Sequence, residues 1–262
     1  TRGRRIAFEL LKLGEKIPGI RRVVSSTAWS FRKAILSSAT ILLPNCKAEA
    51  QQLKDFFNVP PSKMRIIPSG VDKIFMQGEA DRFYKETGLR DFVLCVARVE
   101  SRKNQLRLLK AMKGTKIKVV LIGPPNPAEP SYVQKVKNMV ESEPNFFWFD
   151  AIPYGHQRLR DAYKAARVHA LPSLFDAPGQ ASLQAGVAGL NIVVGDVPPV
   201  REYFKDFAFY ADPLSVKSIR EAVLAAWEAP YTETLSTHIL KRYTWDKIAK
   251  LTLDVYKEIL ES

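Results

Sequence analysis

The sequence predicts an α/β protein in which a parallel β-sheet is covered by helices on both faces. From Val93 onward, short apolar segments alternate with amphipathic stretches of helical length. Strands that are joined by helices form βαβ crossovers, and these crossovers make neighbouring strands parallel. The apolar segments are hydrophobic throughout instead of alternating with polar residues, as expected of strands that are buried on both faces.

The expected elements follow in a regular order. Strands are predicted at 92–97, 117–123, 146–149, 168–172, 191–196 and 207–210. Helices are predicted at 103–112, 131–142, 156–165, 180–188, 198–204 and 215–228. A last helix is expected at 245–261, with Thr244 as its N-cap and Asp246 in its first turn.

Residues 1–75 have a different pattern and are predicted to be a partial preceding α/β domain. They contain expected helices at 4–17, 27–38 and 47–57 and expected strands at 40–45 and 64–70, which are too few for a separate domain. The chain starts without Met and in mid-pattern, so further chain is expected upstream. The charged stretch 71–91 is expected to be a connection.

Composition excludes a disordered chain and leaves the partner classes open. The 262 residues are 46% hydrophobic and 26% charged, which allows a sizeable core. The net charge is +13, and residues 1–60 contribute +7 from eleven basic and four acidic residues. Such a field attracts phosphates, nucleic acid or anionic lipid, unless it is only a solvated surface. Residues 4–17 form a basic amphipathic pattern that fits either a membrane surface or a missing domain.

Cysteine and histidine usage provides no catalytic or metal-binding pattern. Cys46 and Cys95 lie in apolar segments and are interpreted as buried, inert thiols of a reducing compartment. His169 is expected in the core, His156 at a helix start and His238 on a C-terminal helical segment. No Ser-His-Asp or metal-ligand spacing is present, so no metal site is predicted. The basic and aromatic residues match no nucleic-acid module, and no nucleic acid is expected as a partner.

The loop after the first predicted strand is a candidate phosphate site. Parallel sheets of this type bind ligands beyond the carboxyl ends of their strands. Arg98, Arg102 and Lys103 lie there, just before a predicted helix N-terminus. Guanidinium and ammonium groups beside free helix N–H groups are suited to binding phosphate. A solvated charged turn is the alternative.

The loop after the fourth predicted strand, 172–180, is the second candidate. Gly179 starts a helix that is poor in bulky residues, so the amides of Gly179 and Gln180 could approach a phosphate. Asp176 and Gln184 lie eight positions apart and could face one cleft, where they would hydrogen-bond sugar or ribose hydroxyls. An ordinary strand-to-helix turn is the alternative. The third loop, 195–202, contains two prolines and by itself indicates little.

These three loops, in this order, resemble the family-4 glycosyltransferases of the GT-B fold. The resemblance runs from about Thr40 to the C-terminus and includes Ile67-Pro68-Ser69-Gly70-Val71-Asp72, similar to the family's "IPxGVD" connection. CVARVESRKNQLRLLKAM is similar to its "GR…KG…L…A" segment. VHALPSLFDAPGQASLQAGVAGLNIVVGDVPPVREYF is similar to its "LPS…EGFG…LEAMA.G.PVV.SD..G..E" signature.

The resemblance implies three parts and one reaction. Residues 1–75 would end an acceptor-side domain, 76–243 would form a Rossmann-like donor-binding domain, and 244–262 would cross back to the first. The reaction would move a sugar from a nucleoside-diphosphate sugar to a glycan or lipid-linked acceptor, with retention and without metal or cofactor. Arg98, Lys103 and Asp176 would be catalytic. Gly179, Gln180 and Gln184 would bind the donor.

Departures from the family pattern leave two alternatives open. Asp176 and Gln184 stand where the family has two glutamates, and Gln184 replaces a charged acceptor at a loss of about 1 kcal/mol. The chain could therefore be a non-catalytic binding module, or a basic module for anionic lipid or nucleic acid. For the enzyme, a cytoplasmic location is expected, with peripheral attachment to the inner face of the plasma membrane as a further expectation.

Overall fold

The computed structural model describes residues 28–261, which divide into two compact units. The larger unit comprises Ser69–Leu251, and the smaller one combines the described residues of 1–68 with those of 252–262. The helix predicted at 4–17 lies outside the described residues.

The larger unit is built on a six-stranded parallel sheet with the order β3-β2-β1-β4-β5-β6. The strands are β1 (Phe92–Val96), β2 (Lys118–Ile122), β3 (Phe146–Phe149), β4 (Val168–Leu171), β5 (Asn191–Gly195) and β6 (Phe209–Ala211). Every neighbouring pair is parallel. The predicted Rossmann-like fold class is confirmed, and the strand ends differ from the expected ones by at most two residues.

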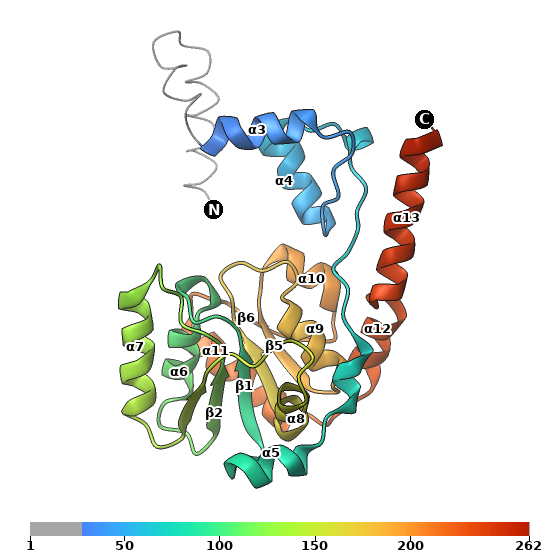
Figure 1. The fold of residues 1–262 in the computed structure, drawn as a ribbon. Helices are drawn as coiled ribbons and strands as arrows, with labels where there is room; N and C mark the ends of the chain where they lie inside the picture. The colour runs from blue at the N-terminus through green and yellow to red at the C-terminus, as the bar shows by residue number, and fades with distance from the viewer. Residues whose placement is uncertain (1–27, 262) are drawn as a thin grey trace, which may run out of the picture. The chain divides into compact units, whose positions relative to one another are not determined.

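Helices cover both faces of this sheet (Figure 1). One face is covered by α6 (Gln105–Met112), α7 (Pro130–Glu141) and α11 (Val216–Glu228). The other is covered by α8 (Gln157–Ala165) and α9 (Gln180–Val187), while α10 (Pro198–Phe204) connects β5 to β6. Apolar side chains of β1 and β2, including the buried thiol of Cys95, pack on α6 and α11. Cys46 is buried too, and its Sγ accepts a hydrogen bond from Glu49 N, so the prediction of buried thiols is confirmed.

Two helices complete the second face: one was not expected, and the other forms the C-terminal helical segment expected around His238. The stretch 71–91, expected only as a connection, contains the 3₁₀ turn Lys73–Gln77 and helix α5 (Ala80–Thr87). The side chains of Phe75 and Phe83 are almost completely buried there, and α5 packs on α8. Helix α12 (Thr234–Arg242) packs on α9, where Gly186 allows close approach, since a Cβ would lie 2.4 Å from Ile239 Cδ1. The small residues of α9 thus accommodate a helix.

The smaller unit contains α3 (Ala28–Ser38) and α4 (Lys47–Phe57), but the strands predicted at 40–45 and 64–70 are wrong. These segments form a single isolated parallel bridge between Leu42 and Met64. Arg65 N donates to Leu42 O at 2.9 Å and Ile67 N to Pro44 O at 3.0 Å. Pro44 has no N–H to donate in return, so the ladder does not continue.

The last helix, α13 (Trp245–Glu261), begins where the sequence predicts it, with Asp246 in its first turn. Just before it, Tyr243 O accepts a hydrogen bond of 2.7 Å from Val71 N. Gly70 lies against the Trp245 ring, where a Cβ would come within 2.5 Å of the indole. Among the described helices, none combines the length and apolarity needed to cross a membrane.

Candidate functional site

The strand order places two of the sequence-predicted loops at one point of the sheet. The chain winds outward in opposite directions from β1 and β4, which lie side by side. The loop after β1 (98–104) and the loop after β4 (172–180) therefore lead to opposite faces of the sheet. Doubly wound sheets bind ligands in the crevice between two such loops.

Hydrogen bonds hold the two loops together across this crevice. Leu174 N donates to Arg102 O at 2.9 Å, and Arg102 Nη1 donates to Phe175 O at 3.0 Å. Asn104 Nδ2 donates to Pro172 O at 2.9 Å from a left-handed backbone conformation with φ of 68°. Asn104 thus separates a 3₁₀ turn, Ser101–Lys103, from α6, so the helix expected to start at 103 starts two residues later.

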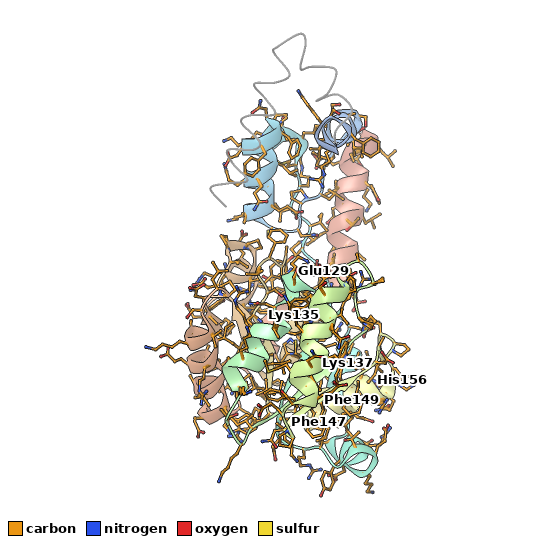
Figure 2. The ribbon with its side chains drawn as sticks, turned by 90° about the vertical axis from the view of Figure 1, so that its left-hand side faces the viewer. Glu129, Lys135, Lys137, Phe147, Phe149 and His156 are labelled. Carbon is orange, nitrogen blue, oxygen red and sulfur yellow. The ribbon has the colours of Figure 1, made fainter. Side chains whose placement is uncertain are left out.

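A third element supports the first loop from outside. Glu129, at the start of α7 in Figure 2, accepts a hydrogen bond of 2.7 Å from Ser101 N. Hydrogen bonds from the side chain and then the backbone of Ser101 hold the pKa of the Glu129 carboxyl below its usual value. The turn that carries Lys103 is therefore held by the second loop on one side and by Glu129 on the other. On the same helix α7, Lys135 and Lys137 are exposed to solvent.

A pocket of about 310 Å³ opens at this crevice. Four of the six sequence-predicted site residues line it, namely Arg98, Lys103, Gln180 and Gln184. The rest of the lining is mostly apolar and consists of Val96, Ala97, Ile152, Tyr154, Leu159, Leu171 and Ala181. The other two predicted site residues, Asp176 and Gly179, lie next to this lining, as the following contacts show.

Arg98 contributes an exposed cation to the pocket. Its guanidinium forms no ion pair or hydrogen bond with any residue in the described range 28–261. Its backbone carbonyl accepts a hydrogen bond of 2.8 Å from Gln105 Nε2, which fixes the loop on the first turn of α6. The main chain is held while the side chain remains available to a ligand.

Lys103 and Asp176 form an ion pair beside the pocket. Lys103 Nζ lies 2.8 Å from Asp176 Oδ2 and 3.1 Å from Oδ1. The two side chains are 15% and 12% exposed, and Arg102 Nη1 lies 3.8 Å from the same carboxylate. The sequence identified both residues but did not predict this pairing. A phosphate at the pocket would share Lys103 with Asp176.

The first turn of α9 presents open backbone donors. Gly179 precedes this helix with a backbone φ of 90°, which residues other than glycine rarely adopt. A Cβ at this position would lie 3.4 Å from the Asp176 carboxylate. The N–H groups of Gln180 and Ala181 hydrogen-bond to none of the residues that the structure describes. Such donors, together with the helix dipole, favour an anion.

Gln184 lines the pocket from the second turn of α9. Its side chain is buried, and Oε1 accepts a hydrogen bond of 2.9 Å from the hydroxyl of Tyr163 on α8. Sequence reasoning did not identify Tyr163, because nothing in the local pattern indicates that α8 and α9 bring these two positions together.

The loop after β3 supplies residues that the sequence analysis missed. Ile152 and Tyr154 line the pocket, and the Tyr154 ring is 57% exposed while packing edge-on against Phe75 at 5.4 Å. In Figure 2, Phe147 and Phe149 mark β3, and His156 lies between this loop and α8. The position of Tyr154 beyond the carboxyl end of a predicted strand was an available signal.

The third candidate loop does not reach the pocket. Asp196 pairs with Arg201 instead, at 2.8 Å between Oδ2 and Nη2, and this bond lowers the pKa of the Asp196 carboxyl. Gly195 lies so close to Ser173 that a Cβ would come within 2.2 Å of its carbonyl oxygen. The end of β5 therefore supports the second loop without lining the pocket.

The histidines lie where the sequence places them. His169 is fully buried in β4, and burial lowers its pKa to about 3, so it is a neutral core residue. His156 caps α8 by accepting a hydrogen bond from Arg158 N at 3.2 Å, and His238 lies on α12. Within residues 28–261, no group of three or more His, Cys, Asp or Glu side chains is arranged to hold a metal.

Fold and site together define a doubly wound α/β protein with a cationic pocket at its switch point. Residues 78–243 match the family model "Glycosyl transferases group 1". Since this match covers more than half of the chain, the chain belongs to that family.

Individual similar proteins support the same family. An uncharacterized glycosyltransferase of Methanocaldococcus jannaschii is 24% identical over 234 residues, which are 82% of this chain and 59% of the relative. The chain spans about half the length of the curated relatives it matches.

Solved structures share the fold. Sucrose-phosphate synthase from Thermosynechococcus elongatus has a TM-score of 0.79 at 18% identity, covering 96% of this chain and 66% of that one. Anabaena HepE, solved in complex with UDP-glucose, has a TM-score of 0.73 at 14% identity, covering 90% and 70%. At these identities the likeness concerns the GT-B-type fold.

Proposed function

We propose that this chain is the donor-binding part of a glycosyltransferase that moves a sugar from a nucleoside-diphosphate sugar to a glycan or lipid-linked acceptor. One observation carries the proposal. The pocket between the loops after β1 and β4 combines the exposed guanidinium of Arg98, the ammonium of Lys103 and the N-terminus of α9. Membership of family 4, retention at the anomeric carbon and independence of metals and other cofactors belong to this proposal.

The three cationic features suit a diphosphate. Negative charge develops on this leaving group as the glycosidic bond breaks, so fixed donors that face it lower the barrier. Arg98 offers a bidentate fork, Lys103 a point charge, and the N–H groups of Gln180 and Ala181 two fixed dipoles. Removal of one such donor typically slows a reaction about a hundredfold.

The remaining lining suits the other parts of a donor nucleotide. The exposed ring of Tyr154 and the side chain of Ile152 provide an apolar surface on which a nucleobase stacks. Gln184, in the pocket lining, would hydrogen-bond the ribose. Asp176, which pairs with Lys103, would lie toward the transferred sugar. The UDP-glucose complex of HepE supports a nucleotide sugar as the donor class.

The acceptor side and the cellular location extend this proposal. The smaller unit would belong to an acceptor-side domain, with 1–75, 76–243 and 244–262 as the three functional parts. The protein would act in the cytoplasm in polysaccharide assembly, and the excess of basic residues in 1–60 would hold it at an anionic membrane surface.

Calorimetric titration with UDP-glucose, UDP-galactose, GDP-mannose and ADP-glucose tests the donor site. We expect one of them to bind, and Arg98→Ala to weaken its binding at least tenfold because a bidentate charged contact is lost. Lys110→Ala, which removes an exposed cation from the far end of α6, is the matched control and should bind like the wild type.

Three outcomes would contradict the proposal. Wild-type affinity in Arg98→Ala would remove the phosphate assignment. Absence of binding by all four nucleotide sugars would favour a non-catalytic module. Salt-sensitive binding to DNA or anionic vesicles without nucleotide binding would favour the basic-module alternative.

A further inference from the structure

Beneath the pocket, Tyr163 contacts the one amide side chain that is buried in the lining. The Tyr163 hydroxyl lies 2.9 Å from Gln184 Oε1 and 3.3 Å from the carbonyl oxygen of Ala181. Tyr163 itself is fully buried, and Gln184 is 5% exposed. This contact therefore lies between α8 and α9 and is shielded from solvent.

Packing holds the Tyr163 ring in one position. It lies edge-on to Phe75, with 5.7 Å between centroids and 89° between planes, and 6.0 Å from the His169 ring. Burial raises the pKa of the phenol well above its ordinary value, so the hydroxyl keeps its proton. The hydroxyl is thus a fixed donor with a single proton to give.

That proton has two acceptors within reach, and distance favours Gln184. Ala181 O belongs to a residue in the first turn of α9 and is the more distant of the two. Gln184 Oε1 faces this hydroxyl at 2.9 Å and accepts the stronger bond, whereas a turned amide would leave the hydroxyl proton only Ala181 O at 3.3 Å, so this amide orientation is favoured. The other amide atom, Gln184 Nε2, is then available to a ligand. It hydrogen-bonds to none of the residues that the structure describes, and it is accessible to solvent.

The orientation decides what the pocket offers to a ligand. If residue 184 were a glutamate, one carboxylate oxygen would accept the hydrogen bond from Tyr163 and the other would face the pocket as an acceptor. The amide presents an N–H donor from the same place. The polarity of this part of the lining is therefore opposite to that of a glutamate, although the two side chains have nearly the same shape.

We propose that Tyr163 is a positioning residue that orients the Gln184 amide so that Nε2 donates a hydrogen bond to a ribose oxygen of the bound nucleotide. The inference rests on the proposed function, since it concerns the ribose of the donor. It makes Tyr163 and Gln184 a unit that recognises the ribose as an acceptor and requires no proton from it.

Fluorinated nucleotides test this directly, because fluorine accepts weakly and cannot donate. The full chain is titrated with UDP, GDP and ADP and with their 2′-fluoro and 3′-fluoro analogues. We expect the wild type to bind one nucleotide and to lose only a small part of its affinity when fluorine, a weak acceptor, stands at the contacted position. Gln184→Glu keeps the Tyr163 bond and should discriminate against that fluorine about fivefold more strongly than the wild type, because its carboxylate needs a hydroxyl donor.

Tyr163→Phe frees the amide to turn, so its discrimination should fall between these two. Tyr203→Phe is the matched control, since this buried tyrosine lies outside the pocket lining and its hydroxyl accepts from Ser69 N at 2.8 Å. Its discrimination should equal that of the wild type, and thermal unfolding verifies that each variant folds.

The outcomes separate the two proposals. Nucleotide binding by the wild type with equal discrimination in Gln184→Glu overturns the orientation of the amide. Wild-type discrimination in a folded Tyr163→Phe variant overturns the role of Tyr163. If no nucleotide binds to the wild type, the proposed function fails and this inference fails with it.

Discussion

The Asp176→Asn variant is expected to be less stable than the wild type without ligand, and yet to bind a nucleoside diphosphate more tightly. The carboxylate is held by Lys103 at 2.8 Å, and both side chains are largely buried, at 12% and 15% exposure. Loss of the charge leaves Lys103 without its partner. The same loss frees Lys103 for phosphate, so stability and affinity should change in opposite directions.

The geometry provides the magnitude. Two unit charges at 2.8 Å attract each other by about 6 kcal/mol at an effective dielectric constant of about 20. Desolvation offsets most of this attraction. Exposed pairs contribute about 0–1 kcal/mol, and the loss of one partner from a fully buried pair costs about 3–5 kcal/mol. For this partly buried pair we expect a loss of about 2 kcal/mol, which lowers Tm by about 4–8 °C in a unit of this size.

A double-mutant cycle isolates the pair. Urea unfolding of the wild type, Asp176→Asn, Lys103→Met and the double variant should reveal a coupling free energy of about 2 kcal/mol. Calorimetry with UDP, which lacks the sugar, should give at least threefold tighter binding for Asp176→Asn. Additive stabilities, or weaker UDP binding by this variant, would refute the reasoning.

Three further perturbations test the core and the loops. The pKa of His169 is about 3 in the folded protein and about 6.5 when unfolded, so the unfolded state binds the extra proton between these values. The free energy of unfolding should therefore fall by about 1.4 kcal/mol per pH unit below pH 6.5, and His169→Leu should remove this slope. Gly179→Ala should lose about 1–2 kcal/mol of stability and weaken nucleotide binding, because its φ of 90° strains a side chain beside Asp176. Gly195→Ala should cost about 3 kcal/mol, because its Cβ would meet a backbone oxygen of Ser173 at 2.2 Å.

Each of these has its own check. Urea titrations at pH 7.5 and pH 5.5 measure the His169 slope, and an unchanged slope in the leucine variant would contradict the assignment. Gly114→Ala is the control for Gly179, since it has a φ of 75° with open space around its Cβ position, and it should leave nucleotide binding unchanged. Wild-type stability of Gly195→Ala would contradict the close packing of β5 on the second loop.

Much of the site was accessible from local sequence, because the rule that locates it is local. A ligand loop follows the carboxyl end of an apolar strand, so Arg98 and Lys103 after β1 and Gly179 and Gln180 after β4 stood out. The same rule covers Tyr154 after β3, but without the strand order nothing ranked its loop among the candidates. The same rule pointed to the loop after β5, which indicated little by itself and lines no part of the pocket.

In the smaller unit, local sequence did not predict the secondary structure correctly. Apolar segments at 40–45 and 64–70 look like strands, but whether such a segment enters a sheet depends on a distant partner and on the donors available to it. Here one ladder ends where Pro44 lacks an N–H group. By contrast, each strand of the larger unit pairs with one or two parallel neighbours in the six-stranded sheet.

The amino-acid order alone specified a parallel sheet covered on both faces, since uninterrupted apolar strands joined by helices permit few other arrangements. Tertiary structure decided which strands became neighbours, and thereby which loops meet at the pocket. It also brought Lys103 against the carboxylate of Asp176 and the Tyr163 hydroxyl against the Gln184 amide. These contacts join positions up to 73 residues apart, and their existence depends on packing between elements, which local pattern does not encode.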